Sequence, residues 1–424
     1  MNYNEAIEYI HSINWTFCKP GLERISALCD MLGNPEKSLK VIHVAGTNGK
    51  GSFCSMLDSV LRAAGYKTGL FTSPYIRFFN ERICFDGKPI SDDELAEITE
   101  YVKPFADSMS EKPTEFELIS AIGFEYFKRH GCDAVILEAG MGGRLDSTNV
   151  IEAPLLSVIT GIAFDHTSFL GDTIEKIAAE KAGIIKNGVP VLWGGESEEA
   201  FGVIKAYAEK MNSEVCVTDR ASVNVTSADL RGTVFDYADR KDIRISLLGS
   251  YQPYNAANVL SVIDILRSRG MDIPESAVRE GLLLARWHAR FELLNKEPVV
   301  IYDGAHNPEG IEAACRSIKN YFGSQKVCVL SGVMRDKDYG YIASMLSSVA
   351  SFAFTVTPDN PRALSASEYA EVLNSRGVKA LPYDSLSQAL RDAYDTAARE
   401  NIPLVCLGSL YMYSELIEEF EKLR

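Results

Sequence analysis

A glycine-rich segment near the N-terminus contains the residue types that bind phosphate. It reads GTNGKGS at 46–52 and follows an apolar run. Glycines let backbone N–H groups close around phosphate oxygens, a following helix adds positive potential at its N-terminus, and a lysine adds a full charge. The spacing departs from the common G-x-x-x-x-G-K-[ST] loop, because Val44 replaces the first glycine and an extra glycine follows Lys50. We predict a phosphate-binding loop; the alternative is an ordinary glycine-rich turn between a strand and a helix.

A second glycine-rich segment follows another apolar run. It reads EAGMGGRLDSTN at 138–149, and Glu138 is the last residue of a strand-like stretch. In open parallel sheets, ligand-binding and metal-binding groups gather where the strands end. A lone buried carboxylate is also costly unless another group pairs with it. We therefore expect Glu138 to bind a metal or a ligand; the alternative is a glycine turn with a solvated salt bridge between Arg144 and Asp146.

Two more candidates lie between residues 160 and 190. Asp165 and His166 follow an apolar strand, so His166 is expected at the same sheet edge as Lys50 and Glu138. That position favours a metal ligand, although a lone histidine is more often structural. Lys181 lies in the helix-like AAEKAGIIK at 178–186, where the default expectation is a solvated lysine.

The same order of strand, polar turn and helix recurs in the last third of the chain. YDGAHNPEG at 302–310 contains Asp303 and His306 directly after an apolar run. The start of a helix explains Asn307 as an N-cap and Pro308 as a first helical residue. It does not explain Asp303 or His306, so we expect these two side chains to contact a ligand.

A sheet must position these groups, and strand-like and helix-like segments alternate along nearly the whole chain. Such alternation is typical of an α/β protein with parallel strands. Helix starts with capping boxes are expected at 91–94 and 172–175, and a small β element is expected within about 215–250. Strands are expected at 41–45, 68–72, 133–139, 155–160 and 189–193, and in a second series from 299 and at 326–332, 352–357 and 403–409.

The two series of strands predict two domains. We expect a large N-terminal P-loop-type parallel-sheet domain over 1–296 and a smaller C-terminal Rossmann-like α/β domain over 297–424, with a turn-like linker at 292–298. The uncharged run at 339–358 contains a glycine, four serines and two threonines. This composition is poor for a membrane span, so we expect a buried helix followed by a strand.

Composition excludes several classes of function. The chain has 424 residues, 46% hydrophobic and 24% charged, as expected of a soluble globular protein, and a net charge of −15. This charge argues against nucleic acid or an anionic membrane as partner, because both require a basic surface. Nine cysteines without a Cys-x-x-Cys pair are typical of reduced cytosolic thiols. The N-terminal segment lacks the features of a signal peptide, so we expect a cytoplasmic protein.

The motifs together resemble folylpolyglutamate synthase, including the bifunctional dihydrofolate synthase form, within the Mur ligase superfamily. GTNGKGS is similar to the P-loop variant of this superfamily, and PTEFELISAIGF at 113–124 to the family's T-x-F-E motif. The resemblance covers nearly the whole chain, and its specificity comes from the order and spacing of the motifs rather than from any single one. The other matching segments are TSPYIRFFNERI at 72–83, EAGMGGRLDSTN, the DH pair at 165–166, EKAGIIK at 180–186 and DGAHNP at 303–308.

The resemblance implies an ATP- and Mg²⁺-dependent ligase. ATP would phosphorylate the carboxylate of a folate, or of dihydropteroate, and the amino group of L-glutamate would attack the acyl phosphate. The C-terminal domain would be the glutamate ligase domain. The resemblance further implies that the ATP phosphates are bound by Thr47, Asn48, Gly49, Lys50, Gly51 and Ser52, and that Mg²⁺ is bound by Ser73, Glu138 and His166 with Ser52 assisting. It implies that Lys181 is carbamylated and that Lys337 lies near the amino acid. Further contacts to the nucleotide would come from Asn255, Arg290, Asp303 and His306.

Two positions depart from the family pattern. Tyr75 replaces the usual histidine of TSPH, which changes the expected contacts on the pterin side. The usual P-G-R-x-E reads HARFE at 288–292, which changes the loop before Arg290.

Three rival functions fit the sequence less well than this ligase. A cell-wall Mur ligase would carry a UDP-sugar domain before the P-loop, whereas only 40 residues precede residue 41. A nucleotide-dependent switch would leave DGAHNP unexplained, and a folate-binding protein without activity would not need the P-loop. We expect a monomer.

Overall fold

The computed structural model describes residues 1–13 and 20–423, and these divide into two compact units. The first unit comprises Met1–Tyr75, Phe79–Ala221 and Asn255–Ala285. The second comprises Ile76–Phe78, Ser222–Tyr254 and Arg286–Arg424. The second unit therefore takes in residues 222–254 and 286–296, which the expected division at 296/297 had assigned to the N-terminal domain.

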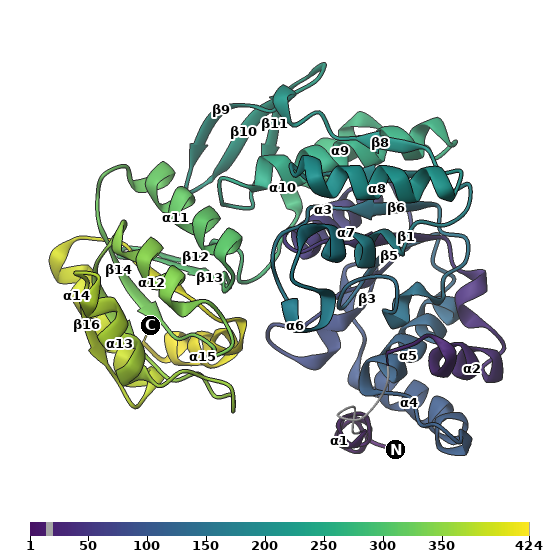
Figure 1. The fold of residues 1–424 in the computed structure, drawn as a ribbon, viewed down its shortest axis with the longest axis horizontal. Helices are drawn as coiled ribbons and strands as arrows, with labels where there is room; N and C mark the ends of the chain where they lie inside the picture. The colour runs from purple at the N-terminus through teal and green to yellow at the C-terminus, as the bar shows by residue number, and fades with distance from the viewer. Residues whose placement is uncertain (14–19, 424) are drawn as a thin grey trace. The chain divides into compact units, whose positions relative to one another are not determined.

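The first unit is built on an eight-stranded sheet (Figure 1) with the strand order β4-β3-β2-β5-β1-β6-β7-β8. Neighbouring strands from β2 to β8 are parallel, and β3 and β4 are added antiparallel at one edge. The expected strands are confirmed, and all five residues of β1 are buried, as an apolar run in a central strand requires. The strands are β1 (Val41–Ala45), β2 (Thr68–Phe71), β3 (Ile83–Phe85), β4 (Lys88–Pro89), β5 (Ala134–Glu138), β6 (Leu156–Ile159), β7 (Val191–Trp193) and β8 (Val215–Val217).

The helices of the first unit begin largely where the sequence indicates. Ser91 and Glu94 form the expected capping box. The segment 172–175 also opens a helix, but the N-cap is Thr173, which accepts from the Lys176 N–H, rather than Asp172. The helices are α1 (Tyr3–Ser12), α2 (Glu23–Met31), α3 (Lys50–Ala63), α4 (Asp92–Ser108), α5 (Glu115–His130), α6 (Thr167–Leu170), α7 (Ile174–Ala182), α8 (Glu198–Lys210), α9 (Gln252–Ser268) and α10 (Glu275–Leu284).

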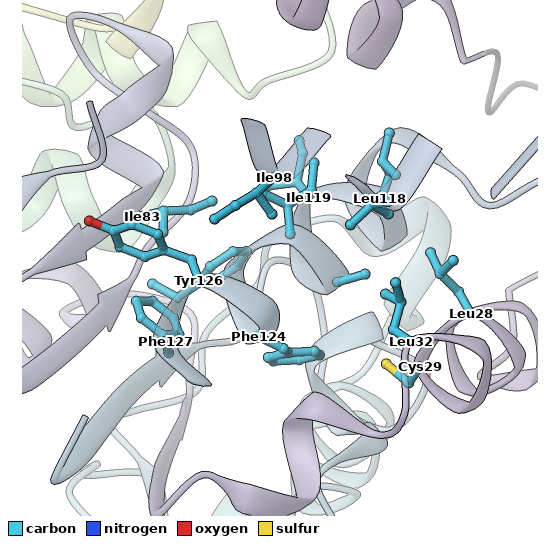
Figure 2. Packing of buried hydrophobic residues seen from close by; sticks show 14 of the residues in the cluster. Leu28, Cys29, Leu32, Ile83, Ile98, Leu118, Ile119, Phe124, Tyr126 and Phe127 are labelled. Atoms are coloured by element: carbon cyan, nitrogen blue, oxygen red, sulfur yellow. The ribbon is translucent and has the colours of Figure 1, made fainter. Parts of the chain in front are cut away.

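A large apolar cluster fixes α5 to its neighbours. Figure 2 shows Leu118, Ile119, Phe124, Tyr126 and Phe127 of α5 beside residues of α2, α4 and β3. Most of these side chains are fully buried, so their removal from water is the main stabilising contribution in this part of the molecule. This packing holds the helix of the T-x-F-E motif against the sheet.

The second unit contains two sheets. A three-stranded antiparallel sheet, β9 (Asn224–Asp229), β10 (Gly232–Tyr237) and β11 (Arg240–Ile245), confirms the expected small β element. The larger sheet has the order β12-β13-β17-β14-β15-β16. Its strands are β12 (Glu292–Lys296), β13 (Val299–Asp303), β14 (Val327–Ser331), β15 (Ala350–Thr355), β16 (Lys379–Pro382) and β17 (Leu404–Leu407).

The expected linker at 292–298 is instead largely a strand. Residues Glu292–Lys296 form β12, which pairs antiparallel with β13. Leu293 packs against one apolar cluster of this unit and Leu294 against the other. Because successive side chains of a strand point to opposite faces, this pair of leucines anchors β12 on both sides of the sheet.

Helices cover the two faces of the larger sheet in the second unit. Residues of α11 (Pro308–Phe322), α12 (Tyr339–Ser347) and α13 (Ala366–Ser375) share one apolar cluster, and residues of α14 (Leu386–Glu400) and α15 (Tyr413–Leu423) share the other. The run at 339–358 forms α12 and then β15, as expected. Within the described residues, no helix is long and apolar enough to span a membrane. The eight described cysteines are free thiols.

Candidate active site

The segment 46–52 is a tight loop between β1 and α3. Gly49 is the residue before α3 and has φ 84°, a left-handed conformation that suits glycine. A Cβ atom at this position would lie 2.6 Å from Asn255 Oδ1. The loop therefore requires glycine for its backbone and also for the close approach of Asn255, whose side chain is buried on α9.

Lys50 bends back over this loop. Its Nζ donates to the carbonyl oxygens of Gly46 at 3.1 Å and Thr47 at 3.2 Å. It also lies 3.8 Å from Glu138 Oε1 at the end of β5. The amine thus lies between the loop and the carboxylate, where it can exchange carbonyl contacts for phosphate oxygens.

The chain after β6 supports the loop from the other side. Thr47 N–H donates to the Gly161 carbonyl at 2.8 Å, and the Thr160 hydroxyl donates to the Asn48 carbonyl at 2.8 Å. Ser52, in the first turn of α3, is 1% exposed. These bonds fix the N–H group of Thr47 and the carbonyl group of Asn48 just before α3. A loop of this kind at a helix N-terminus can bind an anion through its backbone N–H groups.

Glu138 and Ser73 form a small group of oxygen atoms at the edge of the sheet. Glu138 is 3% exposed, and its Oε2 accepts from the Ser73 N–H at 3.2 Å. The Ser73 hydroxyl oxygen is buried without a hydrogen-bond partner among the residues described. A buried hydroxyl in this state is unusual and suits an additional ligand.

The oxygen atoms of Glu138, Ser73 and Ser52 suit magnesium, which binds few protein groups, better than they suit a metal ion whose ligands all come from protein. Within residues 1–13 and 20–423, no group of three or more His, Cys, Asp or Glu side chains could hold a metal ion. Mg²⁺ needs only one or two carboxylates, because phosphate oxygens and water complete its coordination. Glu138, the Ser73 hydroxyl and Ser52 supply hard oxygen atoms of the required kind.

His166 occupies a more open position than Glu138. It follows β6, has φ 49°, and precedes α6. Its ring is half exposed, and Nε2 lies 4.0 Å from Asp165 Oδ2. His166 is seven residues beyond the end of β6, and its ring, unlike the Glu138 side chain, is not buried.

Lys181 is a buried residue rather than a solvated helix lysine. It is 3% exposed, and its Nζ donates to the Gly46 carbonyl at 2.8 Å. Burial lowers the pKa of this amine to about 7, with a further lowering from Lys50; Asp165 and Asp146 act in the opposite direction. Two lysines thus contact the 46–52 loop, and burial favours the neutral form of Lys181.

The position of Lys181 depends on two glycines. A Cβ at Gly143 would lie 3.1 Å from Lys181 Cα, and a Cβ at Gly183 would lie 2.3 Å from Arg144 Cβ. The Arg144 N–H donates to the Glu180 carbonyl at 2.7 Å. The segment 138–149 therefore packs directly against the end of α7, and its glycines permit that approach.

A buried polar chain behind this segment was not predicted from the sequence. His43 is fully buried in β1, and its Nε2 lies 2.8 Å from Thr148 Oγ1. The Thr148 hydroxyl donates to Asp146 Oδ1, and Asp146 Oδ2 accepts from the Met141 N–H at 2.8 Å. Because Thr148 donates its single proton to Asp146, His43 must carry its proton on Nε2.

Burial also changes the protonation equilibria of this chain. It lowers the pKa of His43 to about 3, with a smaller contribution from Lys186. Burial raises the pKa of Asp146, while hydrogen bonds from Thr148 and from the backbone oppose the rise. A histidine within an otherwise apolar strand was the one sequence signal that could have indicated this network.

In the second unit, Asp303 lies at the end of β13 and accepts three hydrogen bonds. Its donors are the Ala305 N–H at 2.8 Å, the Phe291 N–H at 3.0 Å and the Tyr251 hydroxyl at 3.1 Å. Burial raises the pKa of Asp303, and the charge of Arg290 opposes this. Asp303 therefore organises the turn around Arg290.

Arg290 and His306 both lie close to Gly304. A Cβ at Gly304 would lie 2.7 Å from Arg290 Nη1, and His306 Nδ1 donates to the Gly304 carbonyl at 2.7 Å. Arg290 also lines a cavity of about 420 Å³ formed by residues 246–248, 286–288, 290–293 and Leu230. The helix-start explanation is confirmed for Asn307 and Pro308, since Asn307 caps α11 and Pro308 is its first residue. Lys337 is half-buried in the turn after β14.

The chain is similar to known proteins over nearly its whole length. The Mur ligase middle domain matches residues 44–263, and the Mur ligase glutamate ligase domain matches residues 289–410. The chain is 38% identical to the dihydrofolate synthase/folylpolyglutamate synthase of Bacillus subtilis (strain 168), over 98% of each chain. It is 37% identical to the folylpolyglutamate synthase of Lacticaseibacillus casei, over 98% of this chain and 97% of the relative. The structure of E. coli FolC in complex with DHPP and ADP has a TM-score of 0.87 at 29% identity, covering 100% of this chain and 99% of FolC.

Proposed function

This chain belongs to the folylpolyglutamate synthase and dihydrofolate synthase family of Mur ligases, and we propose that this ATP-dependent ligase joins L-glutamate to a folate through an acyl-phosphate intermediate. The observation that supports this most directly is the arrangement around residues 46–52. Lys50 lies between the loop and Glu138, and Lys181 contacts the loop from behind. These are groups that a site for transferring a phosphoryl group between two anions requires.

The chemistry explains why so much positive potential is gathered there. A carboxylate is a poor electrophile, and moving a phosphoryl group onto it brings negative charges together. Lys50, the loop N–H groups and the start of α3 offset that charge, and positioning contributes most of the rest. Magnesium, held by Ser52, Ser73, Glu138 and His166, would neutralise part of the phosphate charge.

Lys181 is proposed to be carbamylated. A neutral lysine amine attacks the carbon of CO₂, forms an N–C bond and releases one proton, which gives an anionic carbamate. The lowered pKa of Lys181 supports this, because only the neutral amine has a free electron pair. The nitrogen of the carbamate keeps one hydrogen, so the bond to the Gly46 carbonyl can persist. The new anion would partner Lys50 and the metal.

The second unit is proposed to supply the remaining contacts. Arg290, Asp303 and His306 would contact the nucleotide, together with Asn255 of α9, and Lys337 would lie near L-glutamate. Residues 297–424 would thus form the core of the glutamate-binding domain, and residues 1–296 would bind ATP and the folate. We also propose a cytoplasmic monomer that acts on reduced folates. The free thiols of the described cysteines fit the reducing compartment. Dihydropteroate is the second acceptor to be tested.

The proposal is tested by measuring phosphate release from ATP with the acceptors offered separately and together. Purified protein is incubated with ATP and Mg²⁺ alone, then with a reduced folate, with L-glutamate, and with both; dihydropteroate then replaces the folate. We expect phosphate and amide to form in equal amounts and only when both acceptors are present. Steady ATP hydrolysis at a rate that does not depend on the folate or on L-glutamate would instead support a nucleotide-dependent switch.

A further inference from the structure

The segment that carries Arg290 has an unfavourable backbone on both sides of this residue. Ala289 has φ 55° and Phe291 has φ 48°, although neither is a glycine. The left-handed conformation is disfavoured for residues with a Cβ atom, so it persists only where the surroundings enforce it. Contacts within the second unit must therefore hold Arg290 in place.

One side of this segment is held by the turn after β13. The Phe291 N–H donates to Asp303 Oδ2 at 3.0 Å, and the Gly304 N–H donates to the Ala289 carbonyl at 2.8 Å. These bonds fix the segment to the start of the Asp303 turn. They leave the Ala289 N–H and the His288 side chain to be held from elsewhere.

Glu292 holds the other side. Its Oε2 accepts from the Ala289 N–H at 2.8 Å, and its Oε1 accepts from His288 Nδ1 at 2.8 Å. The Tyr413 hydroxyl donates to the same Oε2 at 2.7 Å. A single carboxylate thus binds two adjacent residues at the start of the turn and one residue of α15.

Tyr413 is placed rigidly enough to act as an anchor. It is the first residue of α15 and is 1% exposed. Its ring packs edge-on against Tyr302 with 4.9 Å between the ring centroids. The same apolar cluster contains Ala289, so ring and turn are packed together as well as hydrogen-bonded. Burial around Glu292 strengthens bonds to its charge relative to water.

We propose that Tyr413 and Glu292 are positioning residues for Arg290: through His288 and Ala289 they hold the 288–292 turn in the left-handed form that presents the guanidinium to the nucleotide. This inference rests on the proposed contact of Arg290 with ATP. It assigns a role in nucleotide binding to the start of the C-terminal helix. It also explains how a turn with His288 and Ala289 in place of proline and glycine keeps its shape.

Tyr413→Phe tests this role, because it keeps the ring and removes only the hydroxyl, which donates to Glu292 and lies 3.1 Å from His288 Nδ1. A hydrogen bond to a charged group corresponds to about a tenfold change, so we expect KM for ATP to rise about tenfold with kcat within about twofold. KM for L-glutamate should stay unchanged. Tyr383→Phe is the matched control, because the Tyr383 hydroxyl donates to Asp392 at 2.8 Å on α14, away from this turn.

A second substitution separates positioning from general stability. Glycine adopts the left-handed conformation without the Cβ penalty. Ala289→Gly, added to Tyr413→Phe, should therefore recover a large part of the lost ATP affinity. Glu292→Gln keeps the shape of the side chain and removes its charge, so it should raise KM for ATP as Tyr413→Phe does. If Tyr413→Phe fails to fold, Glu292→Gln serves as the test in its place.

Arg290→Ala separates a failure of the proposed nucleotide contact from a failure of the positioning role of Tyr413 and Glu292. If Arg290→Ala leaves KM for ATP unchanged, the proposed contact with the nucleotide is wrong, and the positioning role is wrong with it. If Arg290→Ala raises KM but Tyr413→Phe and Glu292→Gln do not, only the positioning role is overturned. An equal rise in Tyr383→Phe, or no recovery on adding Ala289→Gly, also contradicts it.

Discussion

Lys181 should titrate near neutral pH, more than three pH units below an ordinary lysine. Its pKa is lowered from 10.5 to about 7 by burial and then by Lys50. At pH 7, about half of the Lys181 amines should be neutral, against about one in a few thousand for an unperturbed lysine. The supply of amine able to react with CO₂ is therefore larger by about a thousandfold. This difference makes a carbamate at Lys181 chemically reasonable without an additional catalyst.

The titration can be followed directly by NMR of protein labelled with [¹³C]lysine. The Cε resonance of Lys181 is assigned by its loss in Lys181→Met and followed from pH 6 to 11 in the absence of CO₂. We expect a midpoint near 7, and a higher midpoint in Lys50→Met, because that variant removes the second cause of the shift and leaves burial in place. Adding ¹³C-bicarbonate should produce a carbamate signal that Lys181→Met lacks.

The free energy of unfolding should rise with pH because of the lowered pKa of Lys181. Between about pH 7 and 10.5 the unfolded chain holds a proton on Lys181 that the folded chain has released, so this residue makes the unmodified protein more stable as pH rises through that window. A Lys181 midpoint above pH 9 would refute both the burial argument and the proposed route to the carbamate.

Three further perturbations test separate parts of the account. Lys50→Ala should lower kcat for amide formation by a factor of at least about 10² while the circular dichroism spectrum and Tm stay close to those of the parent protein; near-normal ligation would contradict its phosphate role. Glu138→Ala should raise the Mg²⁺ concentration needed for half-maximal activity, and an unchanged requirement would remove Glu138 from the metal site. The pKa of His43 falls from 6.5 to about 3 on burial, so the unfolded state binds more protons between these values and stability decreases as pH falls through this window. His43→Gln, which keeps an N–H for Thr148, should reduce that decrease in urea unfolding at pH 7 and 5; an identical decrease would show that His43 is not responsible.

The sequence was most informative where local chemistry decides the structure. The strand before residue 46, the loop and the helix that begins at Lys50 follow from apolar patterning and glycine spacing, and the structure has them as expected. Glu138 was predicted at the end of a buried strand, and it is there. The roles proposed for Ser73 and Lys181 came from the resemblance to a known family, because spacing alone did not indicate them.

Features that depend on distant segments were not predictable in the same way. The burial of Lys181 requires Gly143 and Gly183 to bring the segment 138–149 against α7, and no local pattern indicates that approach. The polar chain from His43 to Asp146 joins residues about one hundred positions apart. The prediction of a linker at 292–298 was wrong because it rested on the turn-like residues there. The two adjacent leucines that anchor β12 were given too little weight.

The central claim is that the terminal phosphoryl group of ATP passes to the folate carboxylate before glutamate attacks. Labelling the reacting carboxylate of the folate with ¹⁸O tests this in one experiment, by mass spectrometry of the released phosphate. An acyl phosphate predicts that each turnover moves one ¹⁸O from the folate into inorganic phosphate, and that Lys50→Ala abolishes the transfer together with amide formation. Amide formation that leaves the phosphate unlabelled would contradict the account.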